Sequence, residues 1–128
     1  PFPTAITDSN VNKFPVFRKL LEKAEKKGSV NETIAEYLGE KGTVTGRLRT
    51  IGYFDTELAK YTLMLNGTKD MVITCLDKLF PEVSGVKALK GLSKESLSYI
   101  QDIEKRTGGK FVIISTGPNP EDTIDLRK

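Results

Sequence analysis

The chain has 128 residues, a net charge of +3, a single cysteine and no histidine. This length corresponds to about one domain, and no apolar run long enough to span a membrane and no leader pattern is present, so we expect a soluble, cytoplasmic protein. Without histidine and with only Cys75, the chain cannot form a Ser-His-Asp triad, a Cys-His pair or an ordinary zinc site. If catalysis happens here, we therefore expect this chain to supply only part of it.

Most of the positive charge belongs to one predicted helix. Residues 13–27 carry a net +4, which leaves about −1 for the rest of the chain. A nucleic-acid groove spreads basic side chains along a continuous face and adds aromatic platforms. The charge is typical of a solvated helix face, and we expect no nucleic-acid partner.

The first third of the chain predicts a loop followed by two helices. Two prolines make residues 1–4 a rigid loop, and apolar residues at helical spacing predict an amphipathic helix over about 15–27. Ser29 and Glu32 have the spacing of a capping box, which begins a second short helix that Gly39 ends.

Residues 43–55 place two arginines one residue apart behind a Thr-Gly pair. In an extended chain, Arg47 and Arg49 share one face with Thr45, and Gly46 leaves room for a ligand to approach. Guanidinium groups offer a planar fork of donors that suits a carboxylate or a phosphate. The segment predicts an anion clamp, and a solvated strand face that carries two arginines is the alternative.

A hairpin is predicted next. Residues 60–65 and 71–76 are β-rich runs joined through Asn66-Gly67, a dipeptide typical of tight hairpin turns.

The last third predicts a helix, a strand, a turn and a short strand. These cover residues 93–106, 110–115, 116–120 and 123–126, with Gly108-Gly109 ending the helix. The fold class is therefore α+β, with mixed helices and short antiparallel strands, and a small β-barrel is the alternative.

Two strand ends carry residues suited to a nucleotide base. Asp77 follows the predicted strand 71–76, and a carboxylate can accept from the ring N–H and the amine of guanine. The run Ser115-Thr116-Gly117-Pro118 ends the later strand with a turn whose N–H groups can meet a base carbonyl. Taken singly, Asp77 is also explained as a helix cap or solvated turn residue, and Ser115–Pro118 as an ordinary turn.

Read in order, five segments resemble the C-terminal part of adenylosuccinate synthetase over nearly the whole chain. They are Pro1-Phe2-Pro3-Thr4; Gly42-Thr43-Val44-Thr45-Gly46-Arg47-Leu48-Arg49 with Gly52-Tyr53-Phe54-Asp55; Leu65-Asn66-Gly67 with Thr74-Cys75-Leu76-Asp77; the helix 96–107; and Ser115-Thr116-Gly117-Pro118.

The resemblance implies one domain over residues 1–128, the C-terminal part of a larger α/β nucleotide-dependent ligase. That enzyme forms adenylosuccinate from IMP and L-aspartate with hydrolysis of GTP, and its partners are these small molecules. Its phosphate loop, its catalytic residues and the main ligands of its Mg²⁺ cofactor belong to an N-terminal region that this chain lacks. The resemblance further implies a homodimer of the full enzyme and an inactive isolated chain.

The resemblance also assigns binding roles to particular residues. The aspartate and IMP loop comprises Thr43, Val44, Thr45, Gly46, Arg47, Leu48 and Arg49. The GTP site comprises Arg49, Cys75, Leu76, Asp77, Ser115, Thr116 and Gly117. No metal ligand is assigned to this chain.

The chain departs from the family pattern at Val44, at Cys75, at Leu48 and Thr50, and in residues 13–30, which resemble an insertion. Two other functions stay open. Val44 stands where the family has a threonine, and Cys75 where it has a lysine, which indicates a divergent, archaeal-like member. The first alternative is the phage-type 2-aminoadenylosuccinate synthetase, which acts on dGMP and can use ATP. The second is a small nucleic-acid-binding module.

Overall fold

The computed structural model describes residues 13–23 and 29–127, which belong to two compact units. Unit 1 is Pro1–Phe54 and unit 2 is Asp55–Lys128. The predicted loop at residues 1–4 and the end of the first predicted helix, residues 24–27, lie outside the described part.

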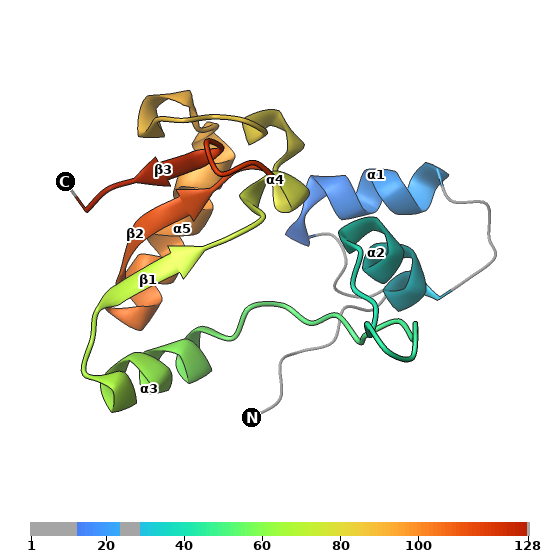
Figure 1. The fold of residues 1–128 in the computed structure, drawn as a ribbon, viewed down its shortest axis with the longest axis horizontal. Helices are drawn as coiled ribbons and strands as arrows, with labels where there is room; N and C mark the ends of the chain where they lie inside the picture. Colours follow the sequence, from blue (N-terminus) through green and yellow to red (C-terminus); the bar gives the residue numbers. More distant parts are fainter. Residues whose placement is uncertain (1–12, 24–28, 128) are drawn as a thin grey trace. The chain divides into compact units, whose positions relative to one another are not determined.

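Unit 1 contains two short helices, α1 (Pro15–Lys23) and α2 (Val30–Leu38), drawn in blue and teal in Figure 1. The predicted capping box is confirmed. The Ser29 hydroxyl accepts from the Glu32 N–H and the Glu32 carboxylate accepts from the Ser29 N–H, both at 3.2 Å. Gly39 ends α2 with φ 72°, in the left-handed region that glycine adopts without strain.

The core of unit 1 joins its two helices to the segment that follows the arginines. Its buried residues are Phe14, Phe17, Ile34 and Ala35. The Phe14 ring lies 5.5 Å from that of Phe17 and 5.9 Å from that of Tyr53. Tyr53 therefore anchors the end of the arginine segment in the core of unit 1.

Unit 2 begins with helix α3 (Thr56–Asn66), where the sequence predicts a strand and a hairpin. That prediction is wrong. The Asp55 carboxylate caps the helix by accepting from the Leu58 N–H at 2.9 Å, and the residues that follow are mostly good helix formers. Gly67 has φ 62° and ends the helix, so Asn66-Gly67 forms a helix C-terminus here rather than a hairpin turn.

The sheet of unit 2 has three strands in the order β1 (Asp70–Ile73), β2 (Lys110–Ser115) and β3 (Thr123–Asp125). β1 pairs with β2 in parallel, from Asp70 beside Lys110 to Ile73 beside Ile114, and β2 pairs with β3 antiparallel. The α+β class with a small sheet is confirmed. Only one of the two pairings is antiparallel, and the strands described form an open sheet rather than a barrel.

A long connection joins the two parallel strands, as parallel pairing requires. It contains α4 (Leu76–Leu79), η2 (Pro81–Val83), η3 (Leu89–Gly91) and α5 (Lys94–Thr107). The predicted late helix is confirmed as α5, capped by the Ser93 hydroxyl and ended by Gly108 at φ 73°.

The core of unit 2 lies between the sheet and α5, which crosses one face of it in Figure 1. The buried apolar residues of this core are Leu76, Phe80, Val83, Leu92, Ile100, Ile103, Phe111, Ile114 and Ile124. Because the core holds β1 and β2 side by side in parallel, their carboxyl ends meet at one edge of the sheet.

Candidate functional site

That shared edge brings together the two strand-end segments singled out in the sequence. The chain leaves β1 into Thr74, Cys75 and Asp77, and it leaves β2 into Ser115–Gly117. In sheets with parallel strands, ligands bind in the crevice beyond the carboxyl ends of the strands. The structure therefore places the predicted guanine-reading segments side by side.

Asp77 lies in the first turn of α4 rather than at the end of a strand, since β1 already ends at Ile73. Its side chain is half-buried, and it accepts no hydrogen bond and forms no ion pair within residues 13–23 and 29–127. Leu76 is fully buried in the core. The carboxylate of Asp77 is thus free to accept from a ligand, and Leu76 serves to hold the helix in place.

Cys75 precedes α4 with φ 58° and has an exposed side chain. Across the described residues it is the one non-glycine residue with a positive φ. This left-handed residue turns the chain from β1 into α4 and so sets the position of Asp77.

Thr116 holds the turn that follows β2. Its side chain is fully buried, and its hydroxyl donates to the Val86 carbonyl at 2.7 Å. Its N–H donates to the Asp122 carbonyl at 2.9 Å, and its carbonyl accepts from the Gly85 N–H at 3.1 Å. All three polar groups of Thr116 are therefore used within the protein.

Asp122 closes the other side of this turn. Its buried carboxylate accepts from the Asn119 N–H at 3.3 Å and from the Asn119 amide at 3.0 Å. A Cβ on Gly117 would lie 2.5 Å from Asp122 Oδ2, so any larger residue would displace the Asp122 side chain. The Ser115 hydroxyl donates to the Gly117 carbonyl at 3.2 Å. Sequence reasoning missed Asp122, although Asn119 and Asp122 in a proline-rich turn are typical of side-chain-stabilised turns.

One donor of this turn remains available. Within the part of the chain that the structure describes, the Gly117 N–H donates no hydrogen bond, whereas the N–H groups of Thr116 and Asn119 are both used. The edge thus offers a free carboxylate at Asp77 and a free N–H at Gly117.

The arginine segment forms a turn and not the continuous extended strand that its sequence predicts. The Gly42 N–H donates to the Arg47 carbonyl at 2.9 Å, and the Gly46 N–H donates to the Gly42 carbonyl at 2.8 Å. Thr43, Val44 and Thr45 are exposed at the tip, and Val44 is 96% exposed. Gly46 completes the turn with φ 65°, which favours glycine.

Arg47 and Arg49 leave the turn with exposed side chains, and Leu48 between them is half-buried, as the alternation of an extended segment predicts. Leu48 forms an antiparallel bridge with Lys41. The two arginines therefore share a face, as expected, but Thr45 and Gly46 belong to the turn.

The two guanidinium groups have different surroundings. That of Arg47 forms no hydrogen bond or ion pair with any described residue. Arg49 Nη1 lies 3.4 Å from Glu40 Oε2, and the Arg49 carbonyl accepts from the Asn31 amide at 3.1 Å. Asn31 also accepts from the Ile51 N–H at 2.7 Å. Helix α2 therefore fixes the backbone around Arg49, while Arg47 is free to meet an anion.

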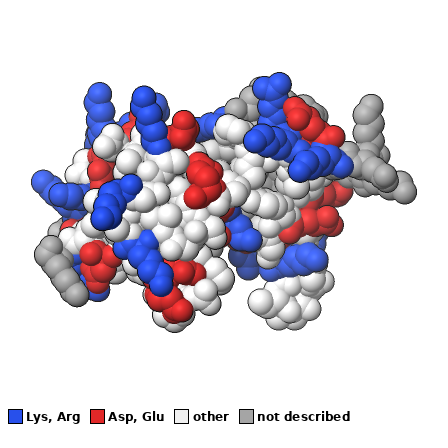
Figure 2. All heavy atoms as spheres, turned by 90° about the horizontal axis from the view of Figure 1, so that it is seen from above, with Lys and Arg blue, Asp and Glu red and all other residues white. Residues whose placement is uncertain are grey.

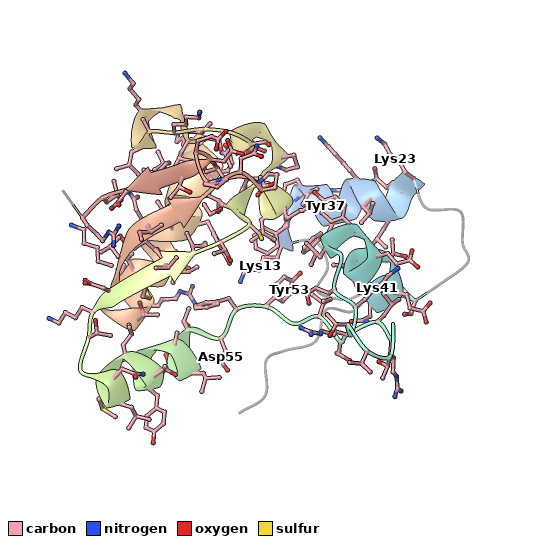
Figure 3. All side chains as sticks on the ribbon, viewed as in Figure 1. Lys13, Lys23, Tyr37, Lys41, Tyr53 and Asp55 are labelled. Atoms are coloured by element: carbon pink, nitrogen blue, oxygen red, sulfur yellow. The ribbon has the colours of Figure 1, made fainter. Side chains whose placement is uncertain are left out.

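Two tyrosines have pKa values above their ordinary range. Burial raises the pKa of Tyr53, although a hydrogen bond with the Lys13 backbone opposes the shift. The Lys13 ammonium lies 4.9 Å from the Tyr53 ring centre, and Figure 3 labels both side chains. Burial, and then the charge of Asp102, raise the pKa of Tyr99. Both rings are therefore neutral at physiological pH and serve as packing groups.

On the face that Figure 2 shows, the lysine and arginine side chains do not form a single basic strip. In Figure 2, lysine and arginine side chains are interspersed with aspartate and glutamate over the face in view. The described residues include no group of three or more cysteine or carboxylate side chains that could hold a metal ion. No helix in the described ranges is both long enough and apolar enough to cross a bilayer.

A solved structure shows the type of protein in which this fold occurs. The fully ligated adenylosuccinate synthetase from Plasmodium falciparum superimposes with a TM-score of 0.67 at 18% identity, covering 98% of this chain and 36% of that one. The chain therefore has the fold of one segment of that larger protein.

Sequence comparisons then establish the family. The adenylosuccinate synthetase family model matches residues 1–83. The adenylosuccinate synthetase of Methanosphaera stadtmanae is 43% identical over 99% of this chain and 31% of its own length, and that of Methanocaldococcus jannaschii is 44% identical over 99% and 30%. The chain belongs to the adenylosuccinate synthetase family. It spans about a third of the length of these relatives.

Proposed function

We propose that this chain is the C-terminal part of an enzyme that joins L-aspartate to IMP with hydrolysis of GTP. Family membership and the order of the five sequence segments support the reaction. The observation that carries the role of this part is the shared sheet edge, where Asp77 and Gly117 each offer one unused polar group. The part of the full-length enzyme that lies outside this 128-residue segment would supply the catalytic groups and the magnesium ligands.

The proposed guanine site uses both groups of that edge. The Asp77 carboxylate accepts from the ring N–H and the amine of guanine, and the Gly117 N–H donates to the guanine carbonyl. Adenine presents the opposite pattern at these positions, so the pair selects guanine. Thr116 and Asp122 act through the turn by holding Gly117 in place. Ser115 and Cys75 complete the edge.

The proposed aspartate and IMP loop is the exposed turn of unit 1. Arg47 binds a carboxylate of L-aspartate and reaches the IMP ribose, assisted by Thr43, Thr45 and the backbone at Val44 and Gly46. Arg49, which α2 holds in place, faces the GTP phosphates. Bidentate hydrogen bonds from a guanidinium to an oxyanion are short and strong, and they orient the anion as well as bind it.

Catalysis by the full-length enzyme would then rest on positioning. Holding aspartate, IMP and GTP in one geometry converts an encounter of three molecules into a step within one complex. Arg49 would stabilise the negative charge on the transferred phosphoryl group, and Arg47 would hold a carboxylate of the attacking aspartate so that its amine is in position. We expect the full-length enzyme to be a cytoplasmic homodimer.

The test is a substrate panel on a full-length protein that contains this segment. Adenylosuccinate formed from IMP, L-aspartate and GTP supports the proposal. Activity with dGMP and ATP in place of IMP and GTP would identify the phage-type enzyme instead. The isolated 128-residue chain should form no product, and measurable product from it would overturn the assignment of catalysis to the remainder.

A further inference from the structure

Helix α3 exposes an apolar face within unit 2. Leu58 is 41% exposed, Tyr61 53%, Met64 67% and Leu65 66%. On the opposite side, Leu63 lies close to Gly109 at the end of α5, and Ala59 is half-buried. The helix therefore has apolar residues on two sides, and the rest of unit 2 covers only one of these sides.

The spacing shows that the exposed residues form one stripe. Leu58, Tyr61 and Leu65 stand at positions i, i+3 and i+7, which share a helix face, and Met64 lies beside them. A helix that is apolar on both sides is normally packed between two layers. Large contiguous apolar patches on a soluble protein mark surfaces that bind another partner.

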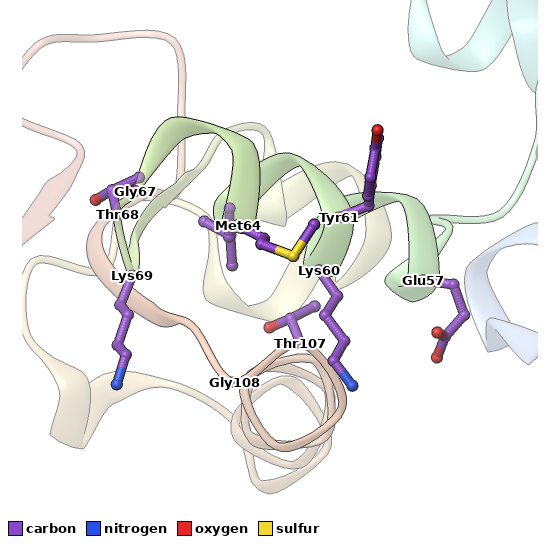
Figure 4. A pocket seen from close by; sticks show the side chains of 10 residues that line it. Glu57, Lys60, Tyr61, Met64, Gly67, Thr68, Lys69, Thr107 and Gly108 are labelled. Atoms are coloured by element: carbon purple, nitrogen blue, oxygen red, sulfur yellow. The ribbon is translucent and has the colours of Figure 1, made fainter.

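A hollow lies next to this stripe, between α3 and the end of α5. It has a volume of about 690 Å³, and Figure 4 shows Met64 of α3 and Thr107 of α5 on opposite sides of it. Lys60 and Lys69 also line the hollow, together with Glu57. A hollow of this size can receive a large side chain from a partner surface.

The comparisons indicate what covers this face. The match takes up 31% of the Methanosphaera stadtmanae relative, so more than two-thirds of that protein lies outside it. We propose that the outer face of α3 (Leu58, Tyr61, Met64 and Leu65), with its hollow, is the surface on which the remainder of a full-length family member packs.

The charges favour this occupant over a second copy of the chain. A twofold contact places the same patch on both sides, and Lys60 and Lys69 of each copy would then surround one apolar centre. Glu57 offsets only one of the two lysines, so each copy would bring a net positive charge, and like charges brought together at an interface oppose association. A remainder of different sequence can supply carboxylates to these lysines.

Association in trans tests the proposal. The 128-residue chain is co-expressed and purified with the part of the Methanosphaera stadtmanae relative that lies outside the match, and the dissociation constant is measured. The double variant M64S/L65S should weaken association about tenfold or more, because truncating central apolar contacts is costly. Leu89→Ser, at an equally apolar residue that is 41% exposed on η3, is the matched control and should leave the affinity unchanged.

A labelling experiment tests the same contact without relying on the affinity of M64S/L65S for the remainder. With Cys75→Ser as background, Met64→Cys should react with a thiol reagent at least about tenfold more slowly in the complex than in the chain alone, because a packed side chain excludes the reagent. Equal reactivity in both states would overturn the proposal. Self-association of the chain that M64S/L65S abolishes would overturn it too, since the occupant would then be a second copy.

Discussion

The two proposed ligand-binding turns of this chain are built in opposite ways. The turn after β2 is held by a fully buried Thr116 and a buried Asp122, whose hydrogen bonds leave one N–H free. The arginine turn of unit 1 is closed by two backbone hydrogen bonds and by the exposed Thr45 hydroxyl, which accepts from the Arg47 N–H at 3.4 Å. No buried side chain holds it, and Val44 at its tip is 96% exposed.

This difference suggests how each turn would work. A rigid turn with one free donor suits the recognition of a flat base, because the donor cannot move to serve a wrong partner. An exposed turn with a free guanidinium suits a small anion that must be enclosed after it arrives. Substitutions in the first turn should therefore change stability and selectivity together, whereas truncation of the exposed Arg47 side chain in the second should change binding alone.

The largest effect is expected at Arg47. In the full-length enzyme, Arg47→Leu should lower kcat/KM for L-aspartate roughly 10- to 100-fold, because hydrogen bonds to charged groups are each worth about 1.5–3 kcal/mol. The free energy of unfolding should not change, since the side chain is exposed and without a partner among the described residues. Arg18→Leu, at another exposed arginine, is the control. An equal loss of kcat/KM with both variants would show that Arg47 does not bind L-aspartate.

Gly117→Ala should affect stability and GTP binding together. The added Cβ meets Asp122 Oδ2 at 2.5 Å, and overpacking of this kind costs about 1–3 kcal/mol. Urea unfolding and the KM for GTP should both report the change. Shortening Asp122 in the double variant G117A/D122A should recover part of the KM effect, and a further loss instead would show that Asp122 does not act through Gly117.

Asp77→Asn should relax the choice of nucleotide. An amide both donates and accepts, so the preference for GTP over ATP should fall about tenfold, the discrimination expected from one hydrogen-bonded contact worth about 1.5 kcal/mol. The ratio of the two kcat/KM values measures this preference. Asp70→Asn, at an exposed carboxylate where β1 begins, should leave the ratio unchanged.

A smaller effect is expected at the ion pair of Arg49. Both side chains are largely exposed, so Glu40→Gln should lower the free energy of unfolding by at most about 1 kcal/mol. The KM for GTP is the more sensitive measurement, because a released Arg49 can sample other rotamers. A large loss of stability would contradict the assignment of a surface pair.

The smallest effect concerns pH. The raised pKa of Tyr99 means that the neutral ring is favoured in the folded state. Its contribution to stability is fully present below about pH 10, the ordinary tyrosine value, and is lost as the pH rises through the higher folded value. Tyr99→Phe should remove this alkaline dependence from the melting temperature. If the melting temperature of the variant fell with pH as that of the wild-type chain does, Tyr99 would not be its source.

Local signals in the sequence predicted α1, α2 and α5. The capping box at Ser29 and the glycines at 39 and 108 act as expected, because each depends only on nearby backbone. The strand predicted over residues 60–65 failed because Asn-Gly can end a helix as readily as it can make a hairpin. Nothing within the segment decides between a helix end and a hairpin turn. The cap from Asp55 before the segment and the packing against α5 favour the helix.

The proposed site was predicted as separate segments and not as an arrangement. Asp77 and Gly117 were selected by chemistry, but their meeting depends on the parallel pairing of β1 with β2, which joins residues about forty positions apart. Asp122 was missed because its role arises from its closeness to Gly117 in space. The different states of Arg47 and Arg49 depend on Glu40 and Asn31, which the spacing of the arginines does not reveal.

The exposed thiol of Cys75 offers a practical route into this site. It is the only cysteine in the sequence, and it lies two residues before Asp77 at the turn into α4. A fluorescent dye attached there would stand at the sheet edge without any engineered residue. The chain therefore contains a natural reporter position, at which a change in emission on addition of GTP would report the proposed nucleotide binding.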